Sequence, residues 1–177
     1  MCGRYFINDT PVQDVYPSQQ AIVLAADPNL PGNVIAKQMI WGFPGVQNKG
    51  LLINARAETA LQKKTYRESV LLRRCVILAG GFYEWNRAKE KFAFERMDGE
   101  KVFMAGCYNW FGEEARFVIL TTAANASVAH VHERMPLMLE EEEVNAWILD
   151  DSVTEQMLSK VPGGLKSRTD YEQMTLF

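Results

Sequence analysis

Cys2 follows the initiator methionine, and this position offers chemistry that the other cysteines lack. Methionine is removed most readily ahead of a small residue, and its removal would leave an α-amine and a thiol on adjacent carbons of Cys2. Free α-amines have pKa values of about 7.7–8.0 and thiols of about 8.5, so a useful fraction of each is nucleophilic near neutral pH. The amine can form a Schiff base with an aldehyde, and the thiol can close on the imine carbon to give a five-membered thiazolidine. The alternative is an incidental cysteine at position two, and the residue taken alone favours that alternative.

Proton transfer in such a reaction needs a titratable partner, and His132 and Glu84 are the candidates. His130 and His132 are two residues apart, so on a strand they would share one face. One histidine suffices for proton transfer, and His132, which Glu133-Arg134 follows, is the better placed; a structural histidine is the alternative. Glu84 stands between two aromatic residues after Gly80-Gly81, and partial desolvation there would raise its pKa toward general acid or base work. The alternative for Glu84 is a carboxylate paired with an arginine.

A second group of residues could bind an unpaired nucleic acid. Asn54 could donate its amide to a substrate oxygen and Arg56 could reach a phosphate, although this segment could equally be a helix entry. Trp41 could stack on an unpaired base, while an ordinary core aromatic is an equally good interpretation. Arginines beside the candidate motifs would form a basic patch, since the planar guanidinium binds phosphate bidentately. They are Arg4, Arg56, Arg73, Arg74 and Arg134.

Short strands must position most of these residues. Residues 76–79 predict a buried strand that leads into the glycines before Glu84. Residues 117–120 predict another strand, which opens into the small polar run 121–125, and loops at strand ends commonly carry function. The chain should therefore present candidate residues where its strands end.

Turn and breaker residues divide the rest of the sheet-forming sequence. Alternating apolar residues on both sides of Asp98-Gly99 predict a hairpin over residues 92–104. Residues 12–40 read as irregular, with short strands such as 21–24 between prolines and a glycine.

Two segments favour helices, and together with the strands they predict the fold class. Residues 58–72 are mostly good helix formers without Gly or Pro, and residues 140–150 begin with four glutamates, which the helix dipole favours in a first turn. Many short strands with few helices predict an α+β fold. We expect a single domain, residues 1–177, on a mostly antiparallel, barrel-like sheet with a few peripheral helices.

Length and composition narrow the class of protein further. The chain has 177 residues, of which 47% are hydrophobic and 23% charged, and this excludes a disordered tail protein or a fibrous repeat. The net charge of −3 removes the argument from a strongly basic domain, so any DNA site must be local. No stretch approaches the roughly 18 apolar residues of a membrane span, and we expect a cytoplasmic protein without membrane contact.

The cysteines and histidines give no sign of a metal centre. Cys2, Cys75 and Cys107 are widely spaced without a C-x-x-C pair, so neither a disulfide framework nor a structural zinc site is expected. Cys75 and Cys107 stand in apolar runs typical of small buried hydrophobes. We therefore expect no metal and no cofactor.

Seven short motifs, in chain order, resemble those of the SOS-response-associated peptidase (SRAP) family, the abasic-site processing proteins. The motifs are Met1-Cys2-Gly3-Arg4-Tyr5, Trp41-Gly42-Phe43-Pro44, Asn54-Ala55-Arg56-Ala57-Glu58-Thr59, Arg74-Cys75, Gly81-Phe82-Tyr83-Glu84-Trp85, Thr121-Thr122-Ala123-Ala124-Asn125 and His132-Glu133-Arg134-Met135-Pro136. Each motif is weak alone, but the seven together cover nearly the whole chain.

The resemblance implies a lesion-shielding protein that acts once per molecule. It would bind single-stranded DNA at an abasic site and join the ring-opened sugar aldehyde to the N-terminal Cys2 as a thiazolidine. The resemblance also implies that Asn54 orients the sugar, that Glu84 transfers protons during imine and ring formation, and that His132 assists sugar-ring opening and reversal. The implied DNA contacts are Arg4, Arg56 and Arg134 on phosphates and Trp41 near the displaced bases. The family name further implies a peptidase activity that removes the residue ahead of Cys2.

Two other functions are compatible with the same residues. A cysteine peptidase acting on protein substrates would use Cys2 as nucleophile, His132 as base and Asn54 as the orienting group. A non-covalent binder of single-stranded DNA would rely on the arginines and Trp41, and its affinity would fall with salt and be indifferent to Cys2→Ala.

Overall fold

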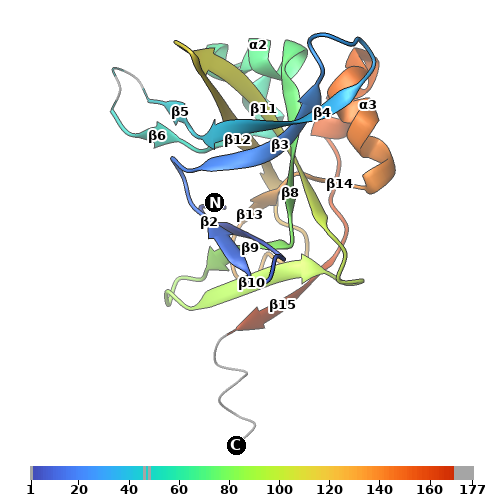
Figure 1. Ribbon diagram of the computed structural model, residues 1–177. Helices are drawn as coiled ribbons and strands as arrows, with labels where there is room; N and C mark the ends of the chain where they lie inside the picture. Colours follow the sequence, from blue (N-terminus) through green and yellow to red (C-terminus); the bar gives the residue numbers. More distant parts are fainter. Residues whose placement is uncertain (1, 46, 48, 170–177) are drawn as a thin grey trace, which may run out of the picture.

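The computed structural model describes residues 2–45, 47 and 49–169, and two β-sheets dominate it (Figure 1). The larger sheet closes into a five-stranded barrel in the order β12-β4-β3-β8-β11, because β11 pairs again with β12. Within the barrel only β12 and β4 run parallel. The strands are β3 (Gln20–Ala26), β4 (Val34–Trp41), β8 (Arg74–Ala79), β11 (Val102–Phe111) and β12 (Glu114–Ala123). The predicted α+β class with a mostly antiparallel, barrel-like sheet is confirmed.

A second, five-stranded sheet lies at one end of the barrel, below it in the view of Figure 1. Its order is β15-β10-β9-β1-β2, and all its pairings are antiparallel. The strands are β1 (Tyr5–Ile7), β2 (Gln13–Val15), β9 (Gly81–Trp85), β10 (Lys91–Arg96) and β15 (Leu165–Thr169). We call it the small sheet. Since β1 also contacts β8 of the barrel, the residues before β1 lie where the two sheets meet.

Short strands and helices complete the molecule. The strands β7 (Asn54–Arg56) and β13 (Arg134–Pro136) flank β12, β14 (Met138–Leu139) pairs with β11, and β5 (Phe43–Pro44) pairs with β6 (Leu51–Leu52). The helices are α1 (Ala57–Ala60), α2 (Lys64–Leu72), α3 (Val144–Leu149) and α4 (Thr154–Leu158), with single turns of 3-10 helix, η2 (Glu141–Glu143) and η3 (Asp151–Val153).

The alternation of side chains along the barrel strands divides the core in two. On β8, Cys75 and Ile77 join the cluster that also holds Cys2 and residues of the small sheet. Val76, between them, belongs to the cluster beneath the helices, together with Trp147. One face of the barrel therefore meets the small sheet, and the other carries the helices.

The helix predicted over residues 58–72 is two helices. The backbone at Lys63 is extended, with φ −91° and ψ 120°, and it separates α1 from α2. Helix α1 buries Ala57 and Ala60, whereas α2 buries Ser69 and Val70. At about 100° per residue these two pairs would face nearly opposite sides of one straight helix, so a break is needed to bury both.

The hairpin predicted over residues 92–104 is wrong, although its turn is present. Gly99 has φ 77° and its N–H donates to the Arg96 carbonyl at 3.1 Å. However, β10 pairs with β9 and β15, whereas β11 pairs with β8, β12 and β14. The chain crosses here from the small sheet to the barrel. Alternation reports which face of a strand is buried, and it does not report the strand's partner.

The helix predicted over residues 140–150 is present, whereas the segment 12–40 differs from its prediction. Residues 141–149 are helical as η2 and α3, and a capping box joins Glu140 and Glu143. Residues 12–40 are more regular than expected, because β3 and β4 pair along their length from Gln20↔Ile40 to Ala26↔Val34. No helix among the described residues is long and apolar enough to cross a membrane.

Candidate functional site

Cys2 is fully buried where the barrel meets the small sheet. Its Sγ lies 3.7 Å from the Arg4 carbonyl oxygen, and its own carbonyl accepts a hydrogen bond of 2.9 Å from Asn54 Nδ2. Burial raises the pKa of the Cys2 thiol, and the charge of Glu84 adds to the rise. In this enclosed state the sulfur is a neutral thiol, and its attack on an electrophile needs a base to take the proton.

Asn54 is held beside Cys2 by strand β7, which runs parallel to β12 with Asn54 opposite Ile119. The amide nitrogen binds the Cys2 carbonyl, while the buried Oδ1 has no hydrogen-bond partner among the described residues. A buried carbonyl oxygen without a partner costs free energy, and a substrate hydroxyl could satisfy it. Asn54 therefore both fixes Cys2 and offers an acceptor.

Glu84 is 3% exposed, on β9. Burial raises its pKa, and the charge of His132 opposes that rise. Since Glu84 acts electrostatically on Cys2 and His132 acts on Glu84, the structure brings the thiol, the carboxyl and the imidazole into one neighbourhood. A carboxyl with a raised pKa can hold a proton at higher pH than an exposed glutamate can, as a general acid requires.

His132 lies at the end of a series of turns, not on the predicted strand. Its Nδ1 accepts a hydrogen bond of 3.0 Å from the Arg134 N–H and lies 3.2 Å from the Arg134 carbonyl oxygen. A neutral Nδ1 can thus accept from the N–H, and a protonated Nδ1 can donate to the carbonyl, without movement of the ring. The His130 ring meets Phe92 and Phe94 edge-on, and both histidines line one surface hollow although neither lies on a strand.

A surface hollow of about 680 Å³ opens beside His132. Trp85 and Arg87 line it together with both histidines and Glu133, and neither was among the predicted site residues. The sequence does carry a signal for Trp85. It follows Glu84 on β9, and because side chains alternate along a strand, a buried Glu84 turns Trp85 toward the surface. Arg87 carries no such signal, because it lies in the connection between β9 and β10.

The five arginines do not form the predicted basic patch. Arg74 is 4% exposed and binds the carbonyls of Val70, Leu71 and Trp147. Arg73 pairs with Glu68 at 3.0 Å. Both therefore have structural partners away from Cys2, and sequence position beside a motif did not place them on one surface.

The three remaining arginines differ in their availability. Arg134 makes a two-pronged ion pair with Glu58. The Arg4 guanidinium lies over the rings of Tyr16 at 4.5 Å and Trp85 at 5.1 Å, and its Nη1 lies 3.7 Å from Asp14. Arg56 is exposed.

Trp41 is a core residue, which corrects its assignment as a platform for bases. It is fully buried, its Nε1 donates to the Ile53 carbonyl at 3.0 Å, and its ring packs against Tyr5 and Phe117. Both faces of the indole are therefore occupied by the protein, and of the two interpretations of Trp41 the core aromatic is correct.

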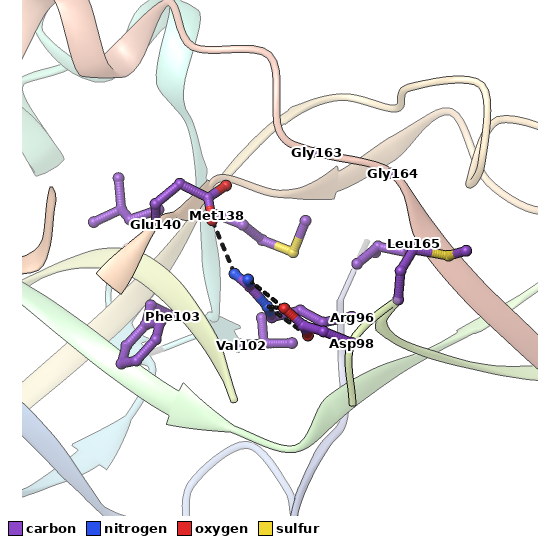
Figure 2. Close-up of a pocket in the computed structure, with 11 residues that line it drawn as sticks. Arg96, Asp98, Val102, Phe103, Met138, Glu140, Gly163, Gly164 and Leu165 are labelled. Atoms are coloured by element: carbon purple, nitrogen blue, oxygen red, sulfur yellow. Dashed lines mark hydrogen bonds and ion pairs between the residues drawn. The ribbon is translucent and has the colours of Figure 1, made fainter. Parts of the chain in front are cut away.

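A smaller hollow of about 150 Å³ has a structural role (Figure 2). Arg96 lies between Asp98 and Glu140 and binds them at 2.8 Å and 2.9 Å, so it joins the crossing turn after β10 to the start of η2. None of the four candidate catalytic residues lines this hollow. Among the described residues, no group of three or more His, Cys, Asp or Glu side chains gathers where it could hold a metal ion.

Comparison with known proteins agrees with this architecture. The family described as SOS response associated peptidase (SRAP) matches residues 6–174. The abasic site processing protein YedK of Escherichia coli is 35% identical over 118 residues, which are 62% of this chain and 53% of YedK. The abasic site processing protein YoqW of Bacillus subtilis is 31% identical over 152 residues, which are 78% of this chain and 66% of YoqW. The matched segments thus span about half to two thirds of these relatives.

Two crystal structures of Bordetella bronchiseptica proteins share the fold. One superimposes with a TM-score of 0.75 at 22% identity, over 88% of this chain and 86% of the other. The second, a phage-related protein, superimposes with a TM-score of 0.78 at 18% identity, over 95% and 93% of the two chains. With the family match extending over nearly all of the described residues, the chain belongs to the SOS response associated peptidase (SRAP) family.

Proposed function

We propose that this protein processes abasic sites in single-stranded DNA by forming a thiazolidine between Cys2 and the sugar aldehyde after Met1 has been removed. The observation that carries the proposal is that an amide binds the buried Cys2 and that the carboxyl of Glu84, whose pKa is raised, acts on both Cys2 and the His132 imidazole. Met1 itself lies outside the described residues. The names of relatives such as YedK and YoqW point to the same lesion.

The proposed chemistry balances without a cofactor. The Cys2 amine adds to C1′ of the ring-opened sugar, and loss of one water gives the imine. The thiol then adds to the imine carbon, so that an S–C1′ bond forms and the thiol proton ends on the nitrogen. Protonated Glu84 supplies the proton that the leaving water needs, and His132 exchanges protons with the sugar oxygens during ring opening.

Asn54 and the surface arginines would hold the DNA. Asn54 Oδ1 would accept from a sugar hydroxyl while Nδ2 keeps the Cys2 carbonyl in place. Arg56 is exposed and would bind a phosphate, whereas Arg134 would have to exchange Glu58 for one. A single-stranded target suits a buried nucleophile. An abasic nucleotide has no base to stack or pair, so its sugar can rotate out of the strand and enter the site at little cost.

The burial of Cys2 weighs against the rival function, a cysteine peptidase acting on other proteins. Such an enzyme needs a thiolate that a peptide bond can reach, and here burial raises the pKa of the thiol. This objection does not apply to a peptidase step confined to the bond ahead of Cys2, because that bond is part of the same chain and need not enter from solution. That step would expose the α-amine that the crosslink requires.

The decisive experiment is the intact mass of the purified protein before and after incubation with a single-stranded oligonucleotide carrying one abasic site. We expect a protein without Met1 and, under denaturing conditions, a covalent product equal to protein plus oligonucleotide minus one water. Cys2→Ala should give no thiazolidine, and Cys2→Ser only traces, because an oxazolidine closes less favourably. Cys107→Ser is the matched control, since Cys107 is equally buried but lies in the cluster beneath the helices.

The rival functions predict different results. If Met1 is absent and no adduct forms, the crosslinking function fails. Reversible binding that weakens with salt and is unchanged in Cys2→Ala would then indicate a non-covalent binder. Cleavage of added peptides that is lost in Cys2→Ala would indicate a peptidase.

A further inference from the structure

The ion pair between Glu58 and Arg134 joins two segments that the sequence separates by 76 positions. Arg134 Nη1 lies 2.7 Å from Glu58 Oε1, and Nη2 lies 2.8 Å from Oε2, so both carboxylate oxygens are engaged. Nη2 also donates to the Thr121 carbonyl at 2.6 Å. The Arg134 side chain is only 11% exposed, compared with 46% for Glu58. A two-pronged pair of this kind fixes a direction as well as a distance, because both the guanidinium and the carboxylate are planar.

The same Arg134 supplies two backbone contacts of the His132 ring. Nδ1 lies 3.0 Å from the Arg134 nitrogen and 3.2 Å from the Arg134 carbonyl oxygen. The position of the Arg134 main chain therefore helps to hold the imidazole, and the contact that Nδ1 makes with it, as acceptor or as donor, decides which nitrogen of the neutral ring carries the proton. With Nδ1 accepting from an N–H, the proton of the neutral ring is on Nε2.

We propose that Glu58 is a positioning residue for His132 and acts through Arg134. Glu58 lies in α1, which directly follows β7, and Asn54 is the first residue of β7. The segment 54–58 would therefore supply the amide that holds Cys2 and, four residues later, the carboxylate that holds the imidazole in place. The inference rests on the proposed function for the role of His132 in proton transfer, but the positioning itself can be tested without DNA.

Two other roles of the Glu58–Arg134 pair make different predictions. In the first, the ladder between β12 and β13, where Ala123 is opposite Arg134, holds the Arg134 backbone without help, and the ion pair only adds stability. In the second, Glu58 occupies a guanidinium that would otherwise bind a DNA phosphate. Removing Glu58 would then tighten DNA binding and leave the chemical step unchanged.

The direct test is nitrogen NMR of the two imidazole rings in DNA-free protein, comparing wild type with Glu58→Gln. The variant keeps the size of residue 58 and removes its charge. At a pH high enough for both rings to be neutral, we expect the wild-type His132 ring in one tautomer with the proton on Nε2, and a mixture of tautomers in Glu58→Gln. His130 should be unchanged and serves as the internal reference, because its ring contacts are with Phe92 and Phe94. Identical His132 signals in the two proteins would overturn the proposal.

The kinetic test separates positioning from DNA binding. At saturating abasic-site DNA, we expect Glu58→Gln to form the adduct more slowly than wild type, by about tenfold or more. A small displacement of a catalytic group is enough to slow a reaction to this extent. The Kd for DNA should stay within about twofold of wild type. Glu58→Asp, which keeps the charge, should recover part of the rate. Glu68→Gln is the matched control, since it also removes one ion pair to an arginine, at 3.0 Å in α2, and should react as wild type does.

The outcomes distinguish this inference from the proposed function. Tighter DNA binding at an unchanged rate would overturn the positioning role, as would an unchanged rate and affinity. If wild type forms no adduct but the His132 tautomer still depends on Glu58, the positioning stands and the crosslinking function fails. Thermal unfolding of each variant shows that the compared proteins are folded.

Discussion

Glu84 is a buried titratable group, and burial makes its effect on stability depend on pH. Burial raises the folded-state pKa above the unfolded value of about 4.3. Between those two pKa values the native state binds more protons than the unfolded state. Glu84 therefore contributes fully to the free energy of unfolding below its unfolded pKa. This contribution is lost as pH rises through its folded pKa.

We therefore predict that Glu84→Gln removes the loss of stability that ionisation of the buried Glu84 causes, and that it slows adduct formation. The difference in Tm between variant and wild type should grow in favour of the variant as pH rises from about 4 toward neutrality. Adduct formation should fall by about a hundredfold. Asp98→Asn is a control with the opposite sign at lower pH: Arg96 lowers the pKa of Asp98 to about 2, so the stability that Asp98 contributes is constant above about pH 4 and is lost as pH falls below it. Tm curves of wild type and Glu84→Gln that run parallel would contradict the assignment.

At the residue scale, the motifs predicted which candidate residues lie together better than they predicted the surroundings of each residue. Cys2, Asn54 and Glu84 were selected from their types and neighbours, and the structure brings them together. The motif around Trp41 could not show that this ring faces Tyr5 and Phe117, because those contacts depend on strands far away in the sequence. The same limit hid the partner of Arg134, since Glu58 belongs to another motif.

Arg74 connects several elements at once and shows how one side chain can fix their arrangement. From the first position of β8 it binds carbonyls at the end of α2 and in α3, and its Nη2 pairs with Asp151 at 2.6 Å. These carbonyls lie at helix ends, where backbone acceptors lack partners within the helix. A buried guanidinium with several fixed donors meets this need as no other side chain does.

We predict that Arg74→Met lowers the free energy of unfolding by about 3 kcal/mol, because buried carbonyl groups lose their donor. Asp151→Asn removes only the ion pair to a carboxylate that is 81% exposed, and it should cost less than about 1 kcal/mol. Urea unfolding of the two variants measures both values. Equal losses in the two would mean that the ion pair, and not the carbonyl contacts, supplies the stability.

The sequence predicted those helices, strands and turns that neighbouring residues determine, and it did not predict which distant strands pair. Strand β8 and the helical segment that begins after Glu140 were predicted from neighbouring residues, and both are present. The Asp98-Gly99 turn also formed, but its flanking strands joined different sheets. A turn signal spans four residues, whereas the choice between β9 and β11 as the partner of β10 is made by the cores of the two sheets.

At the scale of the whole molecule, the site exists because two sheets meet. Composition and strand patterning predicted an α+β barrel-like fold, but the parallel pairings of β12 with β4 and β7 join segments with no sequence signal for each other. Those pairings bring Asn54 to the Cys2 carbonyl. Cys2 is enclosed between these two sheets, and we expect a substrate to reach it through a local opening of their junction.

The junction should open more readily than either sheet unfolds, and the three buried cysteines can measure this. Cys2 precedes β1 and lies outside the strand ladders, whereas Cys75 and Cys107 lie in β8 and β11, in the middle of the barrel. Burial raises the pKa of all three thiols, so intrinsic reactivity favours none of them strongly. Local opening costs less free energy than unfolding, and each 1.4 kcal/mol of difference is about tenfold in rate.

We therefore predict that iodoacetamide labels Cys2 in the native protein at least about tenfold faster than Cys75 or Cys107, as read by peptide mass mapping over time. Asn54→Ala should speed labelling of Cys2 alone, because it removes the hydrogen bond to the Cys2 carbonyl. In urea the three rates should converge, since global unfolding exposes every thiol. Equal rates in native buffer would mean that Cys2 is reached only through global unfolding, and a site closed to that degree could not admit a DNA strand while the protein stays folded.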